Sequence, residues 1–461
     1  MQLNKQIFKV ITTVSLALPS LAAAQNLTSS INTFSPYSMY GLGELATPGT
    51  TSMRSMGGVG VAMRSTNKVN VLNPAAYSQT PQKSFLFEFG VEAGHFRNSQ
   101  TKYGTPQTTA RTAYNSINFH EIAFQMPLAK GLGFGFSLTP YSNVGYNMHS
   151  DELSSGVAGN LGRAQYQYYG DGDVTEAKAG IGWSPFKNFS IGAAMQYYWG
   201  NITRNYKAVP TDIITGSGEY STTTGIDTYD VSRIKAQFGV QWNAILNARR
   251  ALTFGATYDI GGLLGPKSLK YVYIDNLLTS TVRNEEDTSL PLRLPRQIAA
   301  GVFYQTVSIR MGVDYVYQNW GGRNKGYEMT GVSGKDKTSY KVEYTNTSTF
   351  KVGVEYTPNR YDIRHFLKRW SYRAGFRYGS YNQTFNGDRL AQYAVTAGIG
   401  IPVKLWAVSG IDVGVEYGRR GYNVADRLGL VRQQYFKFAV GFTLFAGQEN
   451  GEYWFMRPKY E

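Results

Sequence analysis

The sequence predicts an all-β protein, a transmembrane antiparallel β-barrel of about fourteen strands with an N-terminal plug in its lumen. Fourteen stretches alternate apolar with polar residues, which places successive side chains on opposite faces of a sheet. The connectors between them alternate between short and long, as the two ends of an outer-membrane barrel do. Several runs have the roughly 9 to 11 residues that a tilted strand needs to cross a bilayer.

The strand-like runs follow one another between residues 85 and 445. They cover residues 85–93, 117–126, 132–139, 174–183, 189–199, 231–242, 252–260, 296–304, 307–317, 349–356, 370–378, 392–401, 409–417 and 435–445. The short connectors are 127–131, 184–188 and 305–306, and the long ones include 140–173, 201–230, 261–295 and 319–348. The long connectors are rich in Gly, Ser, Thr, Asn and charge, so we expect them to be loops facing the outside of a cell.

The last run separates a membrane barrel from a soluble β-sandwich. One face carries only apolar side chains, namely Phe436, Phe438, Val440, Phe442 and Leu444. A soluble sheet has the same period, but a stack of sandwich domains would repeat at intervals nearer to about 100 residues, and the sequence contains no such repeat. The 35 Tyr, 24 Phe and 7 Trp residues can supply aromatic belts at both membrane interfaces. Length and composition therefore favour the barrel.

The N-terminus predicts the location. Lys5 and Lys9 precede an apolar run at 10–21, and small residues at 22–24 match a cleavage site, so we expect a signal peptide at 1–24. No other stretch reaches the roughly 18 apolar residues of a transmembrane helix. Cysteine is absent, which excludes disulfides and thiolate metal sites. We therefore expect the outer membrane of a Gram-negative bacterium.

The formal net charge of +15 does not indicate nucleic-acid binding, because the chain has no basic helix and no aromatic RNA-binding signature. Many cations lie in short turns or between apolar strand positions, namely Lys130, Lys187, Arg249, Arg250, Arg360, Arg364, Lys368, Arg369 and Lys404. Basic turns are attracted to anionic headgroups. The expected partners are therefore outer-membrane lipid and lipopolysaccharide, and not nucleic acid.

Three motifs precede the first strand, in a segment that does not alternate. They are SPYSMYGLG at 35–43, SMGGVGVA at 55–62 and NPAAY at 73–77. With the tail containing Trp454 and Phe455, they resemble the FadL family of outer-membrane transporters for hydrophobic compounds, in its diverged branch. The resemblance covers the chain after the signal peptide. It implies a hatch at 25–83 that plugs the lumen, a fourteen-stranded barrel at 84–445 and a periplasmic tail at 446–461.

The residue types of this segment suit a plug. The gate residues that we expect are Gly57, Gly58, Gly60, Asn73, Pro74 and Ala75. Glycines allow close approaches that a side chain would forbid, and Pro74 fixes its own φ and restricts Asn73. The Asn73 amide could cap backbone groups inside the lumen as a latch, or form a plain turn. The alternative for the whole segment is a Gly-rich periplasmic extension without a gate.

The strand pattern also assigns a lumen. Opposite to the apolar face, four runs repeat a charge, a glycine and a charge: Arg310, Gly312, Asp314; Lys351, Gly353, Glu355; Arg373, Gly375, Arg377; Asp412, Gly414, Glu416. With the glycines level in antiparallel strands, Arg310 lies beside Glu355, Glu355 beside Arg373, and Asp314 beside Lys351. We therefore predict a lumenal charge network, because unpaired buried charges are costly.

The level glycines predict a groove for the backbone of the hatch, widened by Thr396, Gly398 and Gly400. Alternatively, these glycines only relieve crowding or help the sheet to curve. Candidate apolar ligand contacts in the hatch are Phe34, Tyr37, Met39, Tyr40 and Leu42, and the alternative for each of them is packing against the wall.

Signs of catalysis are few, so we expect neither an enzyme nor a cofactor or metal site. The four histidines are scattered, and His120 and Glu121 are neighbours in a strand, so we expect them to face opposite ways. Asp171, Asp173 and Glu176 match no calcium-binding loop and indicate a solvated turn.

Two functions remain open. The resemblance implies passive uptake of small hydrophobic compounds through a hatch-gated lumen, which requires a gap in the wall or a pocket above the hatch. The alternative is a non-transporting structural or partner barrel of an outer-membrane secretion or assembly complex. That function requires a sealed lumen and a protein partner at loops or turns. We expect uptake, with the partner barrel as the alternative.

Overall fold

The computed structural model describes residues 33–82, 84–102, 108–152, 163–212, 222–247, 249–263, 268–275, 280–287, 293–321, 324, 327–333, 336–405, 407–423 and 430–446. The predicted signal peptide at 1–24, residues 25–32 of the predicted hatch and the predicted tail beyond Ala446 lie outside these residues.

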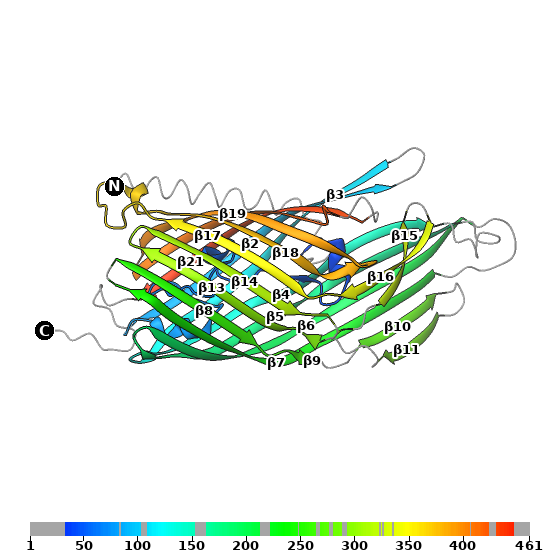
Figure 1. Cartoon of the computed structure of the whole chain (residues 1–461). Coiled ribbons are helices and arrows are strands. Elements are labelled where there is room, and N and C mark those ends of the chain that lie inside the picture. The colour runs from blue at the N-terminus through cyan, green and yellow to red at the C-terminus, as the bar shows by residue number, and fades with distance from the viewer. Residues whose placement is uncertain are drawn as a thin grey trace.

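Fourteen antiparallel strands form a closed barrel (Figure 1). They are β2 (Phe85–Lys102), β3 (Thr108–Ala129), β4 (Leu132–Glu152), β5 (Arg163–Phe186), β6 (Phe189–Asp212), β7 (Thr222–Leu246), β8 (Arg250–Asp259), β13 (Arg296–Thr306), β14 (Ile309–Asn319), β17 (Thr347–Tyr356), β18 (Ser371–Phe385), β19 (Asp388–Leu405), β20 (Ala407–Arg420) and β21 (Arg432–Ala446). The ring closes because β21 pairs with β2. Each predicted run falls on one of these strands, so the predicted fold is confirmed.

The long connectors differ from the prediction. β4 and β5 pair as far as Glu152 and Ala164, and β6 continues to Asp212, so much of the sequence expected to form loops continues the barrel strands. The prediction was wrong because it relied on alternating hydropathy. A hairpin beyond the membrane has water on both faces, so the alternation stops while the ladder of backbone hydrogen bonds continues.

Short strands occupy the other long connectors. They are β9 (Gly262–Leu263), β10 (Ser268–Asp275), β11 (Ser280–Asp287), β12 (Arg293–Leu294), β15 (Tyr327–Ser333) and β16 (Asp336–Tyr344). β10 extends the sheet at β7, and β16 pairs with the far end of β18.

The two faces of the wall carry different side chains. On β14, Met311, Val313 and Tyr315 are 40 to 47% exposed, whereas Asp314 is fully buried. The same alternation on β17, β18 and β20 places the apolar sets on the outside and the charged sets inside, as predicted. No helix among the residues that the structure describes is long and apolar enough to cross a membrane.

Residues 33–82, called the plug below, lie inside the barrel and are drawn in blue in Figure 1. The plug contains the 3₁₀ turn η1 (Pro36–Met39), strand β1 (Glu44–Leu45), helix α2 (Thr51–Arg54) and the 3₁₀ turn η2 (Pro74–Gln79). Most of its residues are buried, and three apolar clusters join it to the wall. The non-alternating sequence before the first strand is therefore an irregular segment enclosed by the barrel.

Candidate functional site: the plug, the wall and the cavity between them

A ring of inward glycines surrounds the plug, called the glycine girdle below. It consists of Gly90, Gly133, Gly182, Gly192, Gly239, Gly255, Gly301, Gly312, Gly353, Gly375, Gly398, Gly414 and Gly441. Every barrel strand except β3 contributes one of them. Many are cross-strand neighbours, such as Gly312 with Gly353 and Gly353 with Gly375. The level glycines predicted in one part of the wall therefore continue around almost the entire barrel.

The plug fits the girdle so closely that side chains are excluded. A Cβ at Gly375 would collide with the backbone nitrogen of Gly57, and a Cβ at Gly353 with the carbonyl oxygen of Met56. On the opposite side, a Cβ at Gly192 would collide with the backbone of Pro74. Since each of these contacts involves plug backbone, a flexible side chain could not give way. The girdle is thus a seat for the plug.

The predicted gate glycines lie against this seat. Gly57 and Gly58 have φ angles of +72° and +81°, which side chains rarely adopt. The Gly57 N–H donates to Thr396 Oγ1 at 2.9 Å, and the Gly60 N–H donates to Asp314 Oδ2 at 2.7 Å. Glycine is therefore required at position 57 both by the positive φ of the turn and by the close contact with the wall.

Asn73 joins the plug to two wall strands. Its Nδ2 donates to the carbonyl oxygens of Val61 at 2.8 Å, Val240 on β7 at 3.2 Å and Ala256 on β8 at 3.5 Å. Its Oδ1 accepts from the backbone N–H of Ala75 at 3.0 Å and so caps η2, with Pro74 at the first helical position. The amide makes both the turn and the wall contact that the sequence left open.

The inward charges form an ion-pair network, called the charge lattice below. Arg373 is its centre: Nε lies 2.7 Å from Glu355 Oε2, and Nη1 lies 2.5 Å from Asp412 Oδ1. Arg310 Nη1 lies 3.3 Å from Glu355 Oε1, and Arg377 Nη2 lies 2.6 Å from Glu416 Oε1. The structure thus places Arg310, Glu355 and Arg373 in the predicted register.

The predicted contact between Asp314 and Lys351 needs correction. The two residues are cross-strand neighbours, but their polar atoms contact the plug. Asp314 Oδ2 accepts from the N–H groups of Gly60 and Val61, and Lys351 Nζ donates to the Gly58 carbonyl at 3.2 Å. The turn at 57–61 presents orphan backbone groups between the two side chains, and these compete successfully with a direct ion pair.

Two plug cations complete the lattice, and sequence reasoning missed both. Arg54 pairs with Glu92 on β2, and Lys68 Nζ lies 2.7 Å from Asp412 Oδ2. Glu44 accepts from Arg420 Nη2 at 2.6 Å, which adds a plug carboxylate. The four predicted wall strands carry four acids and four bases, so their balance gave no signal of partners in the plug.

Two local predictions are wrong. His120 and Glu121 both point inward and are almost fully buried, because a β-bulge opposite Gly90 and Val91 shifts the register. His120 accordingly contacts Arg54, and Glu121 Oε1 accepts from the Thr51 N–H at 2.9 Å. Asp171, Asp173 and Glu176 lie within β5, and not in a turn.

The five candidate apolar contacts pack against the wall. Phe34 stacks on Tyr114 at 5.0 Å, and the rings of Tyr37 and Tyr40 meet Phe385 at 6.0 and 5.1 Å. Leu42 and Met39 belong to an apolar cluster around Trp320. Their surroundings are those of packing residues.

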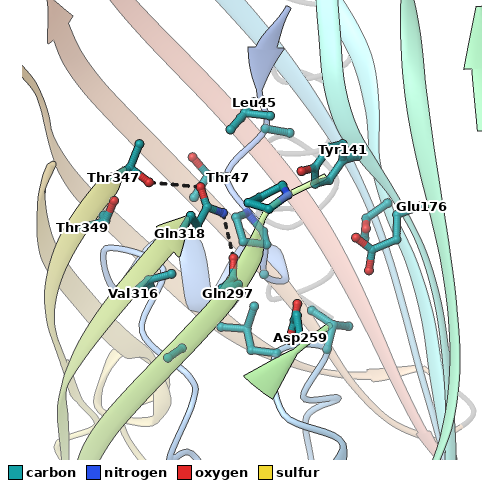
Figure 2. A pocket seen from close by; sticks show the side chains of 18 of the residues that line it. Leu45, Thr47, Tyr141, Glu176, Asp259, Gln297, Val316, Gln318, Thr347 and Thr349 are labelled. Atoms are coloured by element: carbon teal, nitrogen blue, oxygen red, sulfur yellow. Dashed lines mark hydrogen bonds between the residues drawn. The ribbon is translucent and has the colours of Figure 1, made fainter. Parts of the chain in front are cut away.

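A cavity of about 180 Å³ lies between the plug and the wall. Glu176, Asp259, Gln297 and Gln318 point into it from β5, β8, β13 and β14, and Thr47 from the plug (Figure 2). Lys178, Lys235 and Arg377 also line it. Apolar side chains such as Leu45 and Val316 line it as well, so the lining is mixed. Its buried polar groups need hydrogen-bonding partners, which water or a polar solute would supply.

A seam in the wall adjoins the plug. The ladder between β3 and β4 ends at Ile122 and Leu138, although both strands continue. Beyond that point β1 of the plug pairs with β4, and Ala46 N–H donates to the Tyr141 carbonyl at 2.8 Å. The plug thus takes the place of β3 as the neighbour of β4.

Comparison with known proteins identifies the family. The family model BamG matches residues 5–461. The chain belongs to the BamG family. No curated protein is similar enough in sequence to count as a match. The matched residues include both the plug and the barrel, so the two parts belong to one family unit.

The fold of the chain is similar to that of several solved structures. A Pseudomonas aeruginosa FadL homologue has a TM-score of 0.57 and 14% identity, covering 87% of this chain and 99% of its own. The Ralstonia pickettii toluene transporter TbuX has a TM-score of 0.52 and 14% identity, covering 86% and 98%. The CymD monoaromatic hydrocarbon channel has a TM-score of 0.55 and 13% identity, covering 89% and 100%. The chain is thus a diverged FadL-like barrel.

Proposed function

We propose that this BamG-family chain is a plugged, non-conducting barrel of the Gram-negative outer membrane that serves as a structural partner in an outer-membrane assembly complex. The observation that carries the proposal is the glycine girdle. The plug backbone touches wall glycines on opposite sides of the barrel, as at Gly353, Gly375 and Gly192, so a plug that moved aside would abandon its closest contacts. A barrel built in this way is suited to rigidity.

The charge lattice supports the same function. Arg54 and Lys68 are buried cations of the plug whose partners are wall carboxylates. Displacement of the plug would leave Glu92 with Lys437 alone and Asp412 with Arg373 alone. It would also separate the buried plug cations from their partners, which is costly. A transport gate has to open repeatedly at a modest free-energy cost. Moving this plug would have a high free-energy cost, because its buried ion pairs would break.

Uptake of small hydrophobic compounds remains the second candidate, because of the seam between β3 and β4 and the nearby cavity. The similar proteins TbuX and CymD are a toluene transporter and a monoaromatic hydrocarbon channel. At 13 to 14% identity the likeness extends to the fold alone. A hydrocarbon in the cavity would also offer no hydrogen bonds to the polar groups of its lining.

A disulfide between plug and wall separates the two functions. A Cβ at Gly414 would lie 3.8 Å from Ser55 Cβ, within the roughly 3.5 to 4.5 Å that a disulfide requires. The chain has no cysteine, so the double variant Ser55→Cys/Gly414→Cys forms a single defined crosslink. It should be compared in oxidised and reduced form, with each single variant as a control.

The partner function predicts that oxidation changes neither the set of outer-membrane proteins that copurify with the chain nor cell growth. It also predicts that liposomes containing either form take up toluene no faster than empty liposomes. Uptake by the reduced form that oxidation abolishes would refute the proposal and establish a gate.

A further inference from the structure

One connector at the short-turn end of the barrel is unlike the others. The connectors after β3, β5, β7, β13 and β19 contain one to three residues, whereas residues 357–370 separate β17 from β18. Within this segment, called the β17–β18 connector below, Ile363 is 93% exposed and Tyr361 80% exposed. These are the two most exposed large apolar side chains among the residues that the structure describes, and Leu367 adds another at 59%.

The connector has an ordered internal structure. Asp362 Oδ1 accepts from the N–H groups of Arg364 at 2.9 Å and His365 at 2.7 Å, and a 3₁₀ turn η3 (Phe366–Arg369) follows. The Asn359 N–H donates to the Lys368 carbonyl at 2.8 Å and closes the loop. These bonds hold Ile363 and Leu367 on the surface, away from the rest of the protein.

The connector is attached to the lipid-facing side of the wall. The Tyr372 hydroxyl donates to the Leu367 carbonyl at 3.1 Å. Tyr372 belongs to the outward face of β18, and its cross-strand neighbour Tyr356 is outward on β17. Figure 1 shows the connector projecting from this end of the barrel. The exposed apolar side chains are therefore continuous with the surface that faces lipid.

The charge of the connector matches an anionic surface. Arg360, Arg364 and Lys368 are exposed and Arg369 is half-buried, against the single carboxylate of Asp362. That carboxylate is already engaged, since the backbone N–H of His365 holds the pKa of Asp362 below its usual value. Cations beside exposed Ile, Leu and Tyr side chains are the composition of segments that lie in a membrane interface.

We infer that the β17–β18 connector binds the inner leaflet of the outer membrane, with Ile363 and Leu367 at the boundary of the acyl chains and Arg360, Arg364 and Lys368 on lipid phosphate groups. The inference rests on the proposed outer-membrane location and not on the partner function. Lipid accounts for the exposed side chains, the attachment at Tyr372 and the charge together. A periplasmic protein would account for the exposure and the charge only.

The absence of cysteine makes a direct test simple. Ile363→Cys carries an environment-sensitive fluorophore, and the full chain is placed in vesicles of phosphatidylethanolamine and phosphatidylglycerol. The matched control is Gln82→Cys, exposed before β2 at the same end of the barrel. We expect iodide to quench the label at 363 several-fold less than the label at 82, and lipids brominated near the headgroup to quench it more. Equal iodide quenching at both positions would overturn the inference.

Two further arms identify the occupant. Changing Arg360, Arg364 and Lys368 together to Gln, or replacing phosphatidylglycerol by phosphatidylcholine, should increase iodide quenching at 363. A label that is quenched freely in vesicles but protected in native outer membranes would show that a protein covers the connector, and the lipid inference would fail. Because quenching is measured whether or not the lumen conducts, this failure is distinct from that of the proposed function.

Discussion

The plug is held by different chemistry at its two ends. Around α2 the contacts are ionic, because Arg54 meets Glu92 and the neighbouring wall belongs to the charge lattice. Around η2 they are neutral, because Asn73 bonds to wall carbonyls and Gln125 Nε2 donates to Thr80 Oγ1 at 2.5 Å. Both ends share the glycine girdle. Backbone contact with the girdle is therefore common to the α2 side and the η2 side of the plug. Ion pairs are added on the α2 side.

This difference determines how each side should fail. The lattice cations join wall strands to one another or to the plug, so the loss of one leaves buried carboxylates with too little positive charge around them. An amide on the neutral side can be removed with no uncompensated charge. Perturbation of the α2 side should therefore destabilise the whole barrel, whereas perturbation of the η2 side should loosen the plug.

The largest effect should come from Arg373→Met, which leaves Glu355 and Asp412 without their shared partner. We expect a loss of about 3–5 kcal/mol in the free energy of unfolding, measured by urea titration in detergent micelles. The control is Lys341→Met, since Lys341 and Glu343 form an exposed pair at 2.6 Å. Such pairs contribute about 0–1 kcal/mol. Equal losses for the two variants would contradict the lattice.

Gly375→Ala and Gly192→Ala test the seat at its two ends. Each added methyl group would collide with plug backbone, and overpacking of this kind costs about 1–3 kcal/mol. Gly410→Ala is the control, because its Cβ would lie 3.7 Å from the Ile401 carbonyl. The girdle predicts similar losses at positions 375 and 192. A loss at position 375 alone would mean that the seat belongs to the ionic side only.

Asn73 distinguishes a latch from a plain turn. Asn73→Ala removes the cap on Ala75 and the donations to Val61 and Val240, so we expect about 1–3 kcal/mol of destabilisation. Asn73→Asp keeps the acceptor for Ala75 but loses the donor. If Asn73 is a latch, Asn73→Asp should destabilise the protein as much as Asn73→Ala, and trypsin should cleave at Arg54 and Arg64 in both variants. Wild-type stability of Asn73→Asp would show that Asn73 acts only as the cap of η2.

Much of this arrangement could be predicted from the sequence. When one face of a strand is apolar, the other face must point into the lumen. The level glycines then fixed the register that places Arg310 beside Glu355. The bulge at His120 could not be predicted, because an extra residue reverses the faces without altering the composition. The partners of Arg54 and Lys68 were equally inaccessible, since an irregular segment has no period from which to infer neighbours.

The smallest predicted effect is the coupling between Arg310 and Glu355. Their side chains lie 3.3 Å apart, but Arg310 is 19% exposed, and Glu355 also has Arg373 at 2.7 Å. A double-mutant cycle with Arg310→Met and Glu355→Gln should therefore give a coupling of only about 0.5–1 kcal/mol, well below the loss for Arg373→Met. The same cycle on Arg310 and Glu343, which pairs with Lys341 outside the lattice, is the control and should be additive. No coupling in the first cycle would show that Arg310 is a solvated charge at the edge of the lattice, and would confine the ionic side to Arg373, Arg377 and their carboxylates.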